Sequence, residues 1–143
     1  MFETFHGFQG EGFDLIVEDL LALPADAPVL AEGFRLLPRL VAPLLTGRRG
    51  AVWLLPTAAM REAANESRGT TWAIAGRTSD PPHALRNLVE RDELFVVEIA
   101  AQARSLSLPT ISVDGELTID ELVSRLEDLL GLRPIPADGS EAS

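Results

Sequence analysis

The sequence predicts a three-layer α/β fold, in which a mostly parallel sheet of about three strands is flanked by helices. Three short apolar runs each end in a turn and precede a helical pattern: Pro28–Gly33, Gly50–Thr57 and Pro109–Gly115. Strands that alternate with helices in this way form a parallel sheet with helices on its faces. Loops at the carboxyl ends of such strands form the cleft where ligands bind.

Composition narrows the function classes. The 143 residues fit one domain, and 46% hydrophobic residues supply a core. All twelve basic residues are Arg, and 22 acids bring the net charge to −10, which argues against nucleic-acid surfaces and anionic lipid as partners. The absence of Cys excludes disulfides and thiolate nucleophiles. Without a visible signal peptide or an apolar run of about 18 residues, we expect a cytoplasmic protein with no membrane partner.

The first elements follow from apolar spacing and from proline. Leu15, Ile16, Leu20 and Leu23 recur at helical intervals, so a helix is predicted from about Phe13. The segment from Pro24 to Pro28 ends that helix. The next run, Val29–Ala31, predicts a short buried strand, which Glu32–Gly33 closes.

The middle of the chain predicts a second strand between two helices. Residues 34–45 form a helix or helical turn that two prolines interrupt. The run Ala51–Leu55 shows no polar alternation, as expected for a parallel strand buried on both faces. Thr57 is a plausible N-cap for a helix to about Asn65. We predict a polar, glycine-punctuated loop over residues 67–80.

The last part predicts the longest helix, a third strand and a capped helix. Ser79 or Asp80 caps a helix that runs to about Leu106, with two prolines in its first turn. Residues 111–113 form the third strand. Thr118 and Glu121 match a capping box, and a glycine at 131 ends the last helix. We expect one domain over residues 1–132 and a disordered tail over residues 133–143.

Several charged residues are candidates for a site. Glu32 follows the first predicted strand, where a carboxylate holds Mg²⁺ or accepts a proton from an attacking hydroxyl; the alternative is an acid that merely faces solvent. Arg77, Arg86 and Arg91 carry the planar guanidinium that suits phosphate oxygens, although a surface role is usual for any one Arg. Asp114–Gly115 is a ligand contact or a β-turn.

Three well-known catalytic or nucleotide-binding patterns are absent. The sequence holds no Gly-x-x-x-x-Gly-Lys-Ser/Thr phosphate loop, because it has no Lys. It has no Gly-x-Ser-x-Gly elbow for Ser/His/Asp catalysis and no Gly-x-Gly-x-x-Gly turn for dinucleotides.

The run from Gly12 to about Leu132 resembles the later part of a P-loop kinase of the nucleoside, nucleotide and small-molecule kinase type. Val29-Leu-Ala-Glu-Gly33 is similar to the family's strand that ends in an acid and Gly, and Ala51-Val-Trp-Leu-Leu-Pro-Thr57 to the strand before the lid. Two further segments are similar to the lid with its following helix and to the last strand: Arg77-Thr-Ser-Asp80 with Asn87-Leu-Val-Glu-Arg-Asp92, and Ile111-Ser-Val-Asp-Gly115.

The resemblance implies ATP and Mg²⁺ as cofactors and gives the candidate residues roles. Glu32 would lie near the metal and the acceptor hydroxyl, as a catalytic residue together with Arg91. The arginines at 77, 86 and 91 would contact phosphates, and Asp114 and Gly115 would lie near the adenine. The acceptor, a small molecule or nucleotide, would lie between Phe8 and Leu23 and beside Arg35, with Phe8 and Phe13 as contacts.

The sequence departs from the family in one large respect. The family's first strand, phosphate loop and first helix have no counterpart here, so we expect a truncated kinase-like domain with little or no activity of its own. The missing strand is central in the family's sheet, and its loss would leave two strand edges unpaired. Three explanations stay open: a start codon assigned too late, a fragment, or a smaller non-catalytic domain.

Two function classes therefore compete. One is a kinase-like P-loop protein that lacks its phosphate-binding element. The other is a non-catalytic binding module that self-associates or pairs with another chain through exposed sheet edges, which makes a homo-oligomer possible. An unrelated Rossmann-like enzyme ranks last, because its glycine-rich turn is missing.

Overall fold

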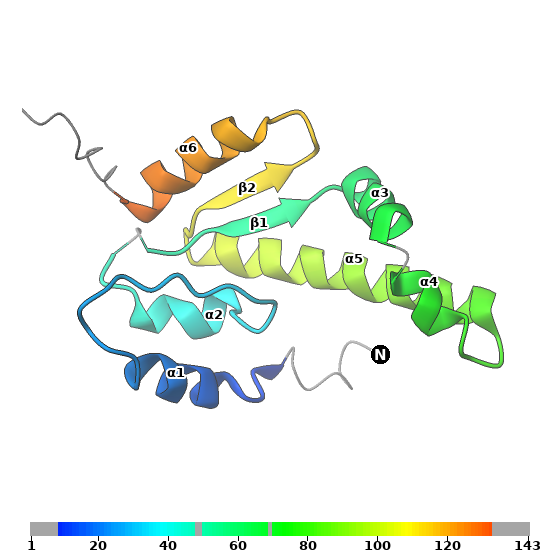
Figure 1. Cartoon of the computed structure of the whole chain (residues 1–143), viewed down its shortest axis with the longest axis horizontal. Coiled ribbons are helices and arrows are strands. Elements are labelled where there is room, and N and C mark those ends of the chain that lie inside the picture. The colour runs from blue at the N-terminus through cyan, green and yellow to red at the C-terminus, as the bar shows by residue number, and fades with distance from the viewer. Residues whose placement is uncertain (1–8, 48–49, 69, 133–143) are drawn as a thin grey trace, which may run out of the picture.

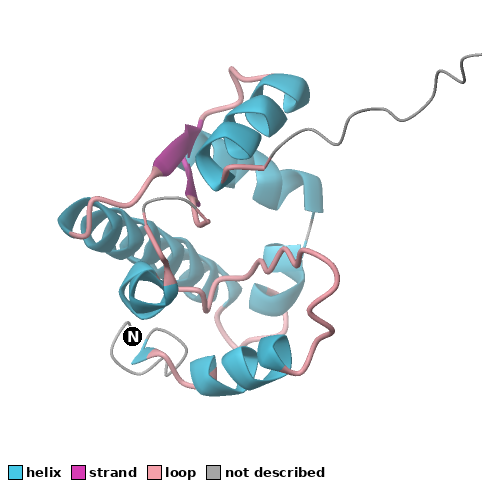
Figure 2. Ribbon diagram, turned by 90° about the vertical axis from the view of Figure 1, so that its left-hand side faces the viewer, coloured by secondary structure: helices cyan, strands magenta, loops and turns pink. Residues whose placement is uncertain are grey.

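The computed structural model describes residues 9–47, 50–68 and 70–132. Helices and strands are mixed along this part of the chain (Figure 1). Its elements, in chain order, are α1 (Phe13–Leu21), α2 (Pro38–Val41), the 3-10 helix η2 (Ala42–Leu44), β1 (Trp53–Pro56), α3 (Ala58–Arg68), α4 (Thr70–Ala75), α5 (Pro81–Ser105), β2 (Thr110–Val113) and α6 (Ile119–Leu130). Figure 2 shows how little of the chain the strands occupy.

The sheet consists of β1 and β2, which run parallel. Trp53 pairs with Thr110, and Pro56 pairs with Val113. The second and third predicted strands are therefore confirmed, and so is their common direction. The burial expected on both faces of the second strand is wrong, because Leu54 is exposed and no residue of β1 is fully covered. The connection between them contains α3, α4 and α5, as a parallel pair requires a long crossover. Helices α5 and α6 lie on opposite sides of the strand pair (Figure 1).

The first predicted strand is wrong in this structure. Val29–Ala31 forms no strand and is exposed. A strand exists only where a neighbour takes its backbone hydrogen bonds, and no described segment pairs with these residues. The sheet accordingly has two strands within the described residues, and the sequence had predicted about three.

The long helix α5 supports the strand pair. Asp80 caps it by accepting a hydrogen bond from the His83 N–H at 3.1 Å, and two prolines occupy its first turn, as predicted. Near its end, the side-chain carbonyl of Gln102 accepts from the Arg39 N–H at 3.2 Å, which ties α2 to α5. Only Ile99 and Ala103 of this helix are buried.

The buried core is small. The buried hydrophobic side chains of the described residues come from five separate places in the chain: Phe13, Leu37, Ala75, Ile99, Ala103 and Ile111. Trp53 ties β1 to one of these places, because its indole N–H donates to the Leu36 carbonyl at 2.9 Å, next to the buried Leu37. By contrast, no residue of α6 is buried, so this helix rests on the sheet with its apolar side partly open.

Three further predictions concern the connecting segments. The loop predicted over residues 67–80 contains α4 and part of α3, so this prediction is wrong for most of the segment. The proline-interrupted helix at residues 34–45 is reduced to the short α2 and η2. The tail at residues 133–143 lies outside the described residues. Within the described ranges, no helix combines the length and the apolar character that crossing a membrane requires.

Candidate functional site

The carboxyl ends of β1 and β2 meet at one edge of the sheet. The Thr57 N–H donates to the Val113 carbonyl at 2.9 Å, and the Thr57 hydroxyl accepts from the Met60 N–H at 3.3 Å, so Thr57 both extends the pair and starts α3. Arg61 closes the end of β1 by donating to the Pro56 carbonyl at 2.8 Å. This edge is where α/β folds bind ligands.

Asp114 and Gly115 form the turn after β2 at this edge. The Asp114 carboxylate accepts a hydrogen bond from the Glu116 N–H at 3.0 Å, which is the Asx-turn geometry of a tight loop. Gly115 has a φ of 91°, and a Cβ there would lie 3.9 Å from the Met60 sulfur of α3. Of the two alternatives for this pair, the structure shows the turn, which lies beside the start of α3. Contact with a ligand stays a prediction.

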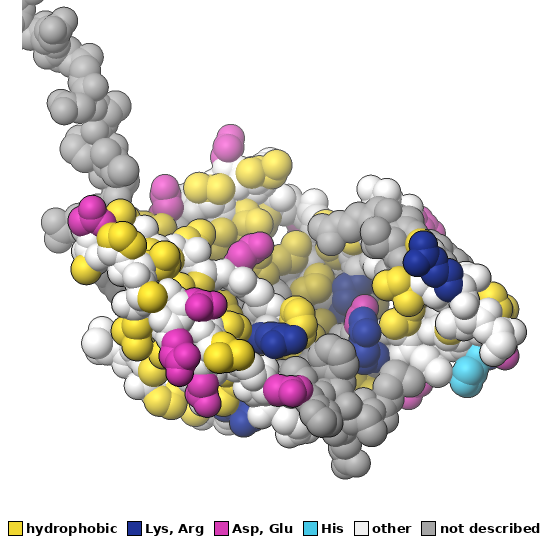
Figure 3. Space-filling view, turned by 60° about the horizontal axis from the view of Figure 1, so that its bottom comes forward, with side chains coloured by type: hydrophobic (Ala, Val, Ile, Leu, Met, Phe, Trp, Pro, Cys, Tyr) yellow, Lys and Arg dark blue, Asp and Glu magenta, His cyan; other side chains and the backbone are white. Residues whose placement is uncertain are grey.

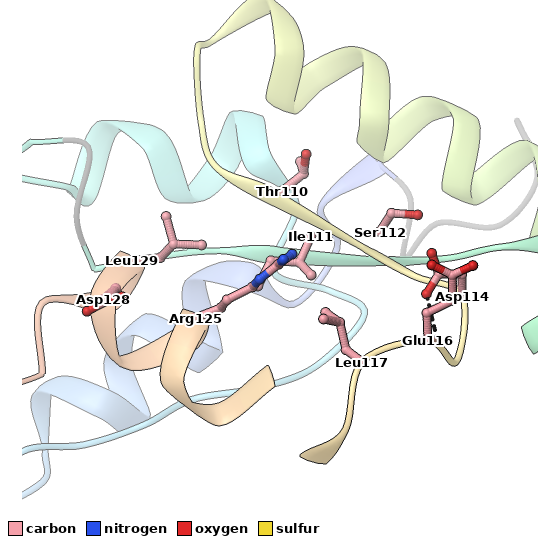
Figure 4. A pocket seen from close by; sticks show the side chains of 9 residues that line it. All are labelled: Thr110, Ile111, Ser112, Asp114, Glu116, Leu117, Arg125, Asp128 and Leu129. Carbon is pink, nitrogen blue, oxygen red and sulfur yellow. Dashed lines mark hydrogen bonds between the residues drawn. The ribbon is translucent and has the colours of Figure 1, made fainter. Parts of the chain in front are cut away.

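A cavity of about 480 Å³ opens between β2 and α6. Its lining residues are Thr110, Ile111, Ser112, Asp114, Glu116, Leu117, Arg125, Asp128 and Leu129. Figure 4 shows Arg125 and Leu117 reaching toward Ile111, while Asp114 and Glu116 group at one end. Three carboxylates oppose one guanidinium, so the cavity favours a cationic or hydroxyl-bearing group over a phosphate.

The N-terminus of α6 positions one wall of this cavity. The Thr118 N–H donates to the Glu121 carboxylate at 2.9 Å, and the Thr118 hydroxyl donates to it at 2.8 Å. These two bonds, with a smaller contribution from the Arg125 charge, hold the pKa of Glu121 below its ordinary value of 4.5. The capping box predicted from the sequence is confirmed, and α6 begins where it was expected.

The predicted catalytic residues are not brought together by any described contact. Glu32 lies exposed in the irregular segment after α1. Arg77 follows α4, and Arg86 and Arg91 lie on the first half of α5. Arg91 binds its neighbour Asp92 through Nε and Nη2, at 2.9 and 2.5 Å. Within the described residues, no hydrogen bond or ion pair joins Glu32 to these arginines.

One of the predicted acceptor-site residues, Arg35, forms a local contact near the start of α1. Arg35 Nη1 donates to the Glu11 carbonyl at 3.4 Å, and its guanidinium lies 5.7 Å from the centre of the Phe34 ring. Gly12 allows this approach, because a Cβ there would lie 2.7 Å from Arg35 Nη1. Phe13 is buried in the core, so its ring is not available to a substrate in this arrangement. Phe8 lies outside the described residues.

The described part of the chain contains no group of three or more His, Cys, Asp or Glu side chains that could hold a metal ion. No family model, no curated protein and no solved structure matches the chain.

Sequence reasoning missed Arg125, which is the only basic residue among the described residues that line this cavity. Arg125 follows Glu121 by four residues on a helix whose start was predicted, and this spacing places the two side chains on one face. The helical spacing therefore predicts that Arg125 lies on the same face as Glu121. It does not predict that α6 packs against β2, which is what brings Arg125 to the cavity.

Proposed function

We propose that this chain is a binding module built on part of a kinase-like α/β sheet, and that it completes the sheet with a β-strand of another polypeptide. The open edge of β1 carries the proposal. In the described part of the chain, β1 pairs with β2 alone. A strand edge with unpaired N–H and C=O groups is a template for another strand.

The backbone bonds of β1 indicate which groups are open. The N–H groups of Trp53 and Thr57 donate to the carbonyls of Pro109, just before β2, at 3.2 Å and of Val113, in β2, at 2.9 Å. Alternate residues of a parallel strand bond to opposite sides. The N–H and C=O of Leu54 therefore point to the edge away from β2, and they are the groups that an added strand would bind.

The exposed segment Val29–Ala31 also supports the proposal. Its three side chains are all apolar, yet Val29 and Leu30 are exposed. The kinase resemblance assigns this segment to a strand that pairs with the missing central strand and not with β1. A segment deprived of its only neighbour would have the irregular, exposed character that Val29–Ala31 has.

Amide hydrogen exchange of the full chain tests the proposal. Alone, the Leu54 amide should exchange faster than those of Trp53, Leu55 and Thr57. A heptapeptide of alternating Val and Arg should protect it. Leu54→Pro removes this single donor without touching the bonds to β2. It should therefore prevent the peptide from binding, so that neither the Val52 amide nor the amides of the peptide become protected. Leu54→Ala keeps the donor and should retain this protection.

Two results would contradict the proposal: a Leu54 amide that is already protected in the monomeric chain, or equal peptide binding by the Pro and Ala variants. Size-exclusion chromatography tests the alternative in which the chain pairs with a second copy of itself. A dimer that Leu54→Pro dissociates would mean that a second copy supplies the strand.

The kinase-like alternative retains one specific observation in its favour. Two strands that resemble family strands pair in parallel, and Thr57, Asp114 and Gly115 meet at their carboxyl ends. Under this candidate ATP with Mg²⁺ binds at that edge, with Arg77, Arg86 and Arg91 toward the phosphates and Glu32 toward the metal. The test is calorimetric titration with ATP and Mg²⁺. Binding tighter than about 1 mM that Asp114→Asn or Glu32→Gln weakens would support it, and its absence would count against it.

A further inference from the structure

The segment from α1 to Phe34, which we call the acidic arm (residues 13–34), leaves most of its apolar side chains uncovered. Only Phe13 is buried. The exposed large hydrophobic residues of the arm are Leu15, Leu20, Leu21, Leu23, Val29, Leu30 and Phe34. Leu21 is 80% exposed and Leu30 is 77% exposed. Contiguous apolar exposure of this kind indicates an interaction surface.

The charges of the arm all have one sign. Its ionisable residues are Asp14, Glu18, Asp19, Asp26 and Glu32, and it contains no Arg. All five are exposed, and none forms an ion pair with another described residue. Figure 3 shows acidic and hydrophobic side chains interspersed over the face that carries α1. The arm therefore combines apolar contact area with five carboxylates that no ion pair with a described residue neutralises.

We propose that the acidic arm docks a basic, amphipathic segment of a different polypeptide. Charge complementarity selects this partner: Arg or Lys side chains would meet the five carboxylates while Leu-type side chains cover the arm's apolar ones. A second copy is disfavoured, because it brings the same acidic arm and a net charge of −10. Anionic membrane is disfavoured for the same reason. The inference rests on the proposed binding function and adds the chemistry of the partner.

Two synthetic peptides of 16 residues test the inference, one with Leu and Arg in a helical amphipathic pattern and one with Glu in place of every Arg. The full chain should bind the Arg peptide, more weakly as salt rises, and should not bind the Glu peptide. Asp14→Asn/Glu18→Gln/Asp19→Asn should weaken binding about tenfold, because each exposed ion pair contributes a factor of about two. Leu21→Ser/Leu30→Ser should also weaken it, by removing apolar contact.

A matched control separates the arm from the overall charge. Glu62→Gln/Glu66→Gln/Glu90→Gln removes three exposed carboxylates from α3 and α5, and it should change affinity less than about twofold. Equal weakening by the control, or binding of both peptides alike, would overturn the inference. So would a homodimer that the arm variants dissociate, because the partner would then be a second copy.

The experiments on the acidic arm can fail independently of those on the strand-pairing proposal. All the substituted side chains of the arm and of the control are exposed, so circular dichroism should show unchanged folding. If the arm variants bind the Arg peptide normally while the strand peptide still protects Leu54, only the docking inference fails. If Leu54 is never protected while the arm variants lose the Arg peptide, only the strand pairing fails.

Discussion

At the scale of single residues, the clearest arrangements are those that neighbouring residues specify by themselves. Thr118 and Glu121 satisfy each other's backbone N–H groups, at 3.3 Å and 2.9 Å. Both partners lie within four residues, so the capping box could be predicted from the sequence. The same holds for Asp80, which caps α5. Trp53 differs, because its bond to the Leu36 carbonyl joins residues 17 apart and depends on the fold.

The lowered pKa of Glu121 predicts an acid-sensitive start of α6. Folding favours the carboxylate, so its stabilising effect is complete above the ordinary value of 4.5 and is lost as pH falls through the lowered pKa. Between about pH 5 and pH 3, the wild type should therefore lose more stability than Glu121→Gln. Urea unfolding at each pH measures this difference, with Glu127→Gln as the control. An identical pH profile for wild type and Glu121→Gln would refute the prediction.

The indole bond of Trp53 predicts a measurable cost for a conservative change. Trp53→Phe keeps an aromatic ring but leaves the Leu36 carbonyl without its donor, so it should lower the free energy of unfolding by about 1 kcal/mol. Denaturant unfolding followed by circular dichroism measures the effect. In the wild type the indole N–H should exchange slowly with solvent. Rapid exchange of that proton, or an unchanged unfolding midpoint, would show that the bond contributes nothing.

At the scale of elements, local patterns predicted the helices better than the sheet. The long helix α5 and α6 lie where periodicity and caps placed them, because their hydrogen bonds close within each segment. Ala51–Leu55 and Val29–Ala31 look alike as apolar runs, yet only the first overlaps a strand. The difference is the partner: β1 finds β2, and Val29–Ala31 finds none. The candidate site shows the same difference between local and long-range structure. The turn at Asp114 forms within a few residues and was predicted, whereas the approach of Arg125 to β2 depends on the fold and was not.

The few buried side chains of α5 predict a sharp contrast within one helix. Ile99 is 6% exposed and Val97 is 61% exposed. Ile99→Ala leaves a cavity in a small core and should cost about 3 kcal/mol, whereas Val97→Ala should cost less than about 0.5 kcal/mol. Thermal or urea unfolding compares the two variants. Equal costs would mean that α5 packs against the rest of the chain through a different face.

At the scale of the whole molecule, charge and apolar exposure point the same way. A chain with 46% hydrophobic residues buries six hydrophobic side chains among the described residues and leaves many others open. Its acids outnumber its arginines by ten, since 22 acids stand against twelve Arg. An uncovered apolar surface favours association, while a single-sign field prevents like molecules from meeting. A partner of opposite charge would cover the apolar surface and would be attracted, not repelled, by the acidic side chains. The two proposals, for the open β1 edge and for the acidic arm, therefore both call for a different polypeptide.

The same excess of acids predicts a protein that salt stabilises. At neutral pH the carboxylates repel one another more in the compact state than in the unfolded chain. Raising NaCl from about 0.02 to about 0.2 M shortens the screening length from roughly 20 to roughly 7 Å, and it should raise Tm by a few degrees. The sequence pI is about 4.5, so the effect should vanish near that pH, where the net charge is close to zero. Asp14→Asn/Glu18→Gln/Asp19→Asn should show a smaller response at neutral pH, because it removes part of the repulsion. A Tm that falls with salt at neutral pH would mean that attractive ion pairs, such as Arg91 with Asp92, outweigh the repulsion.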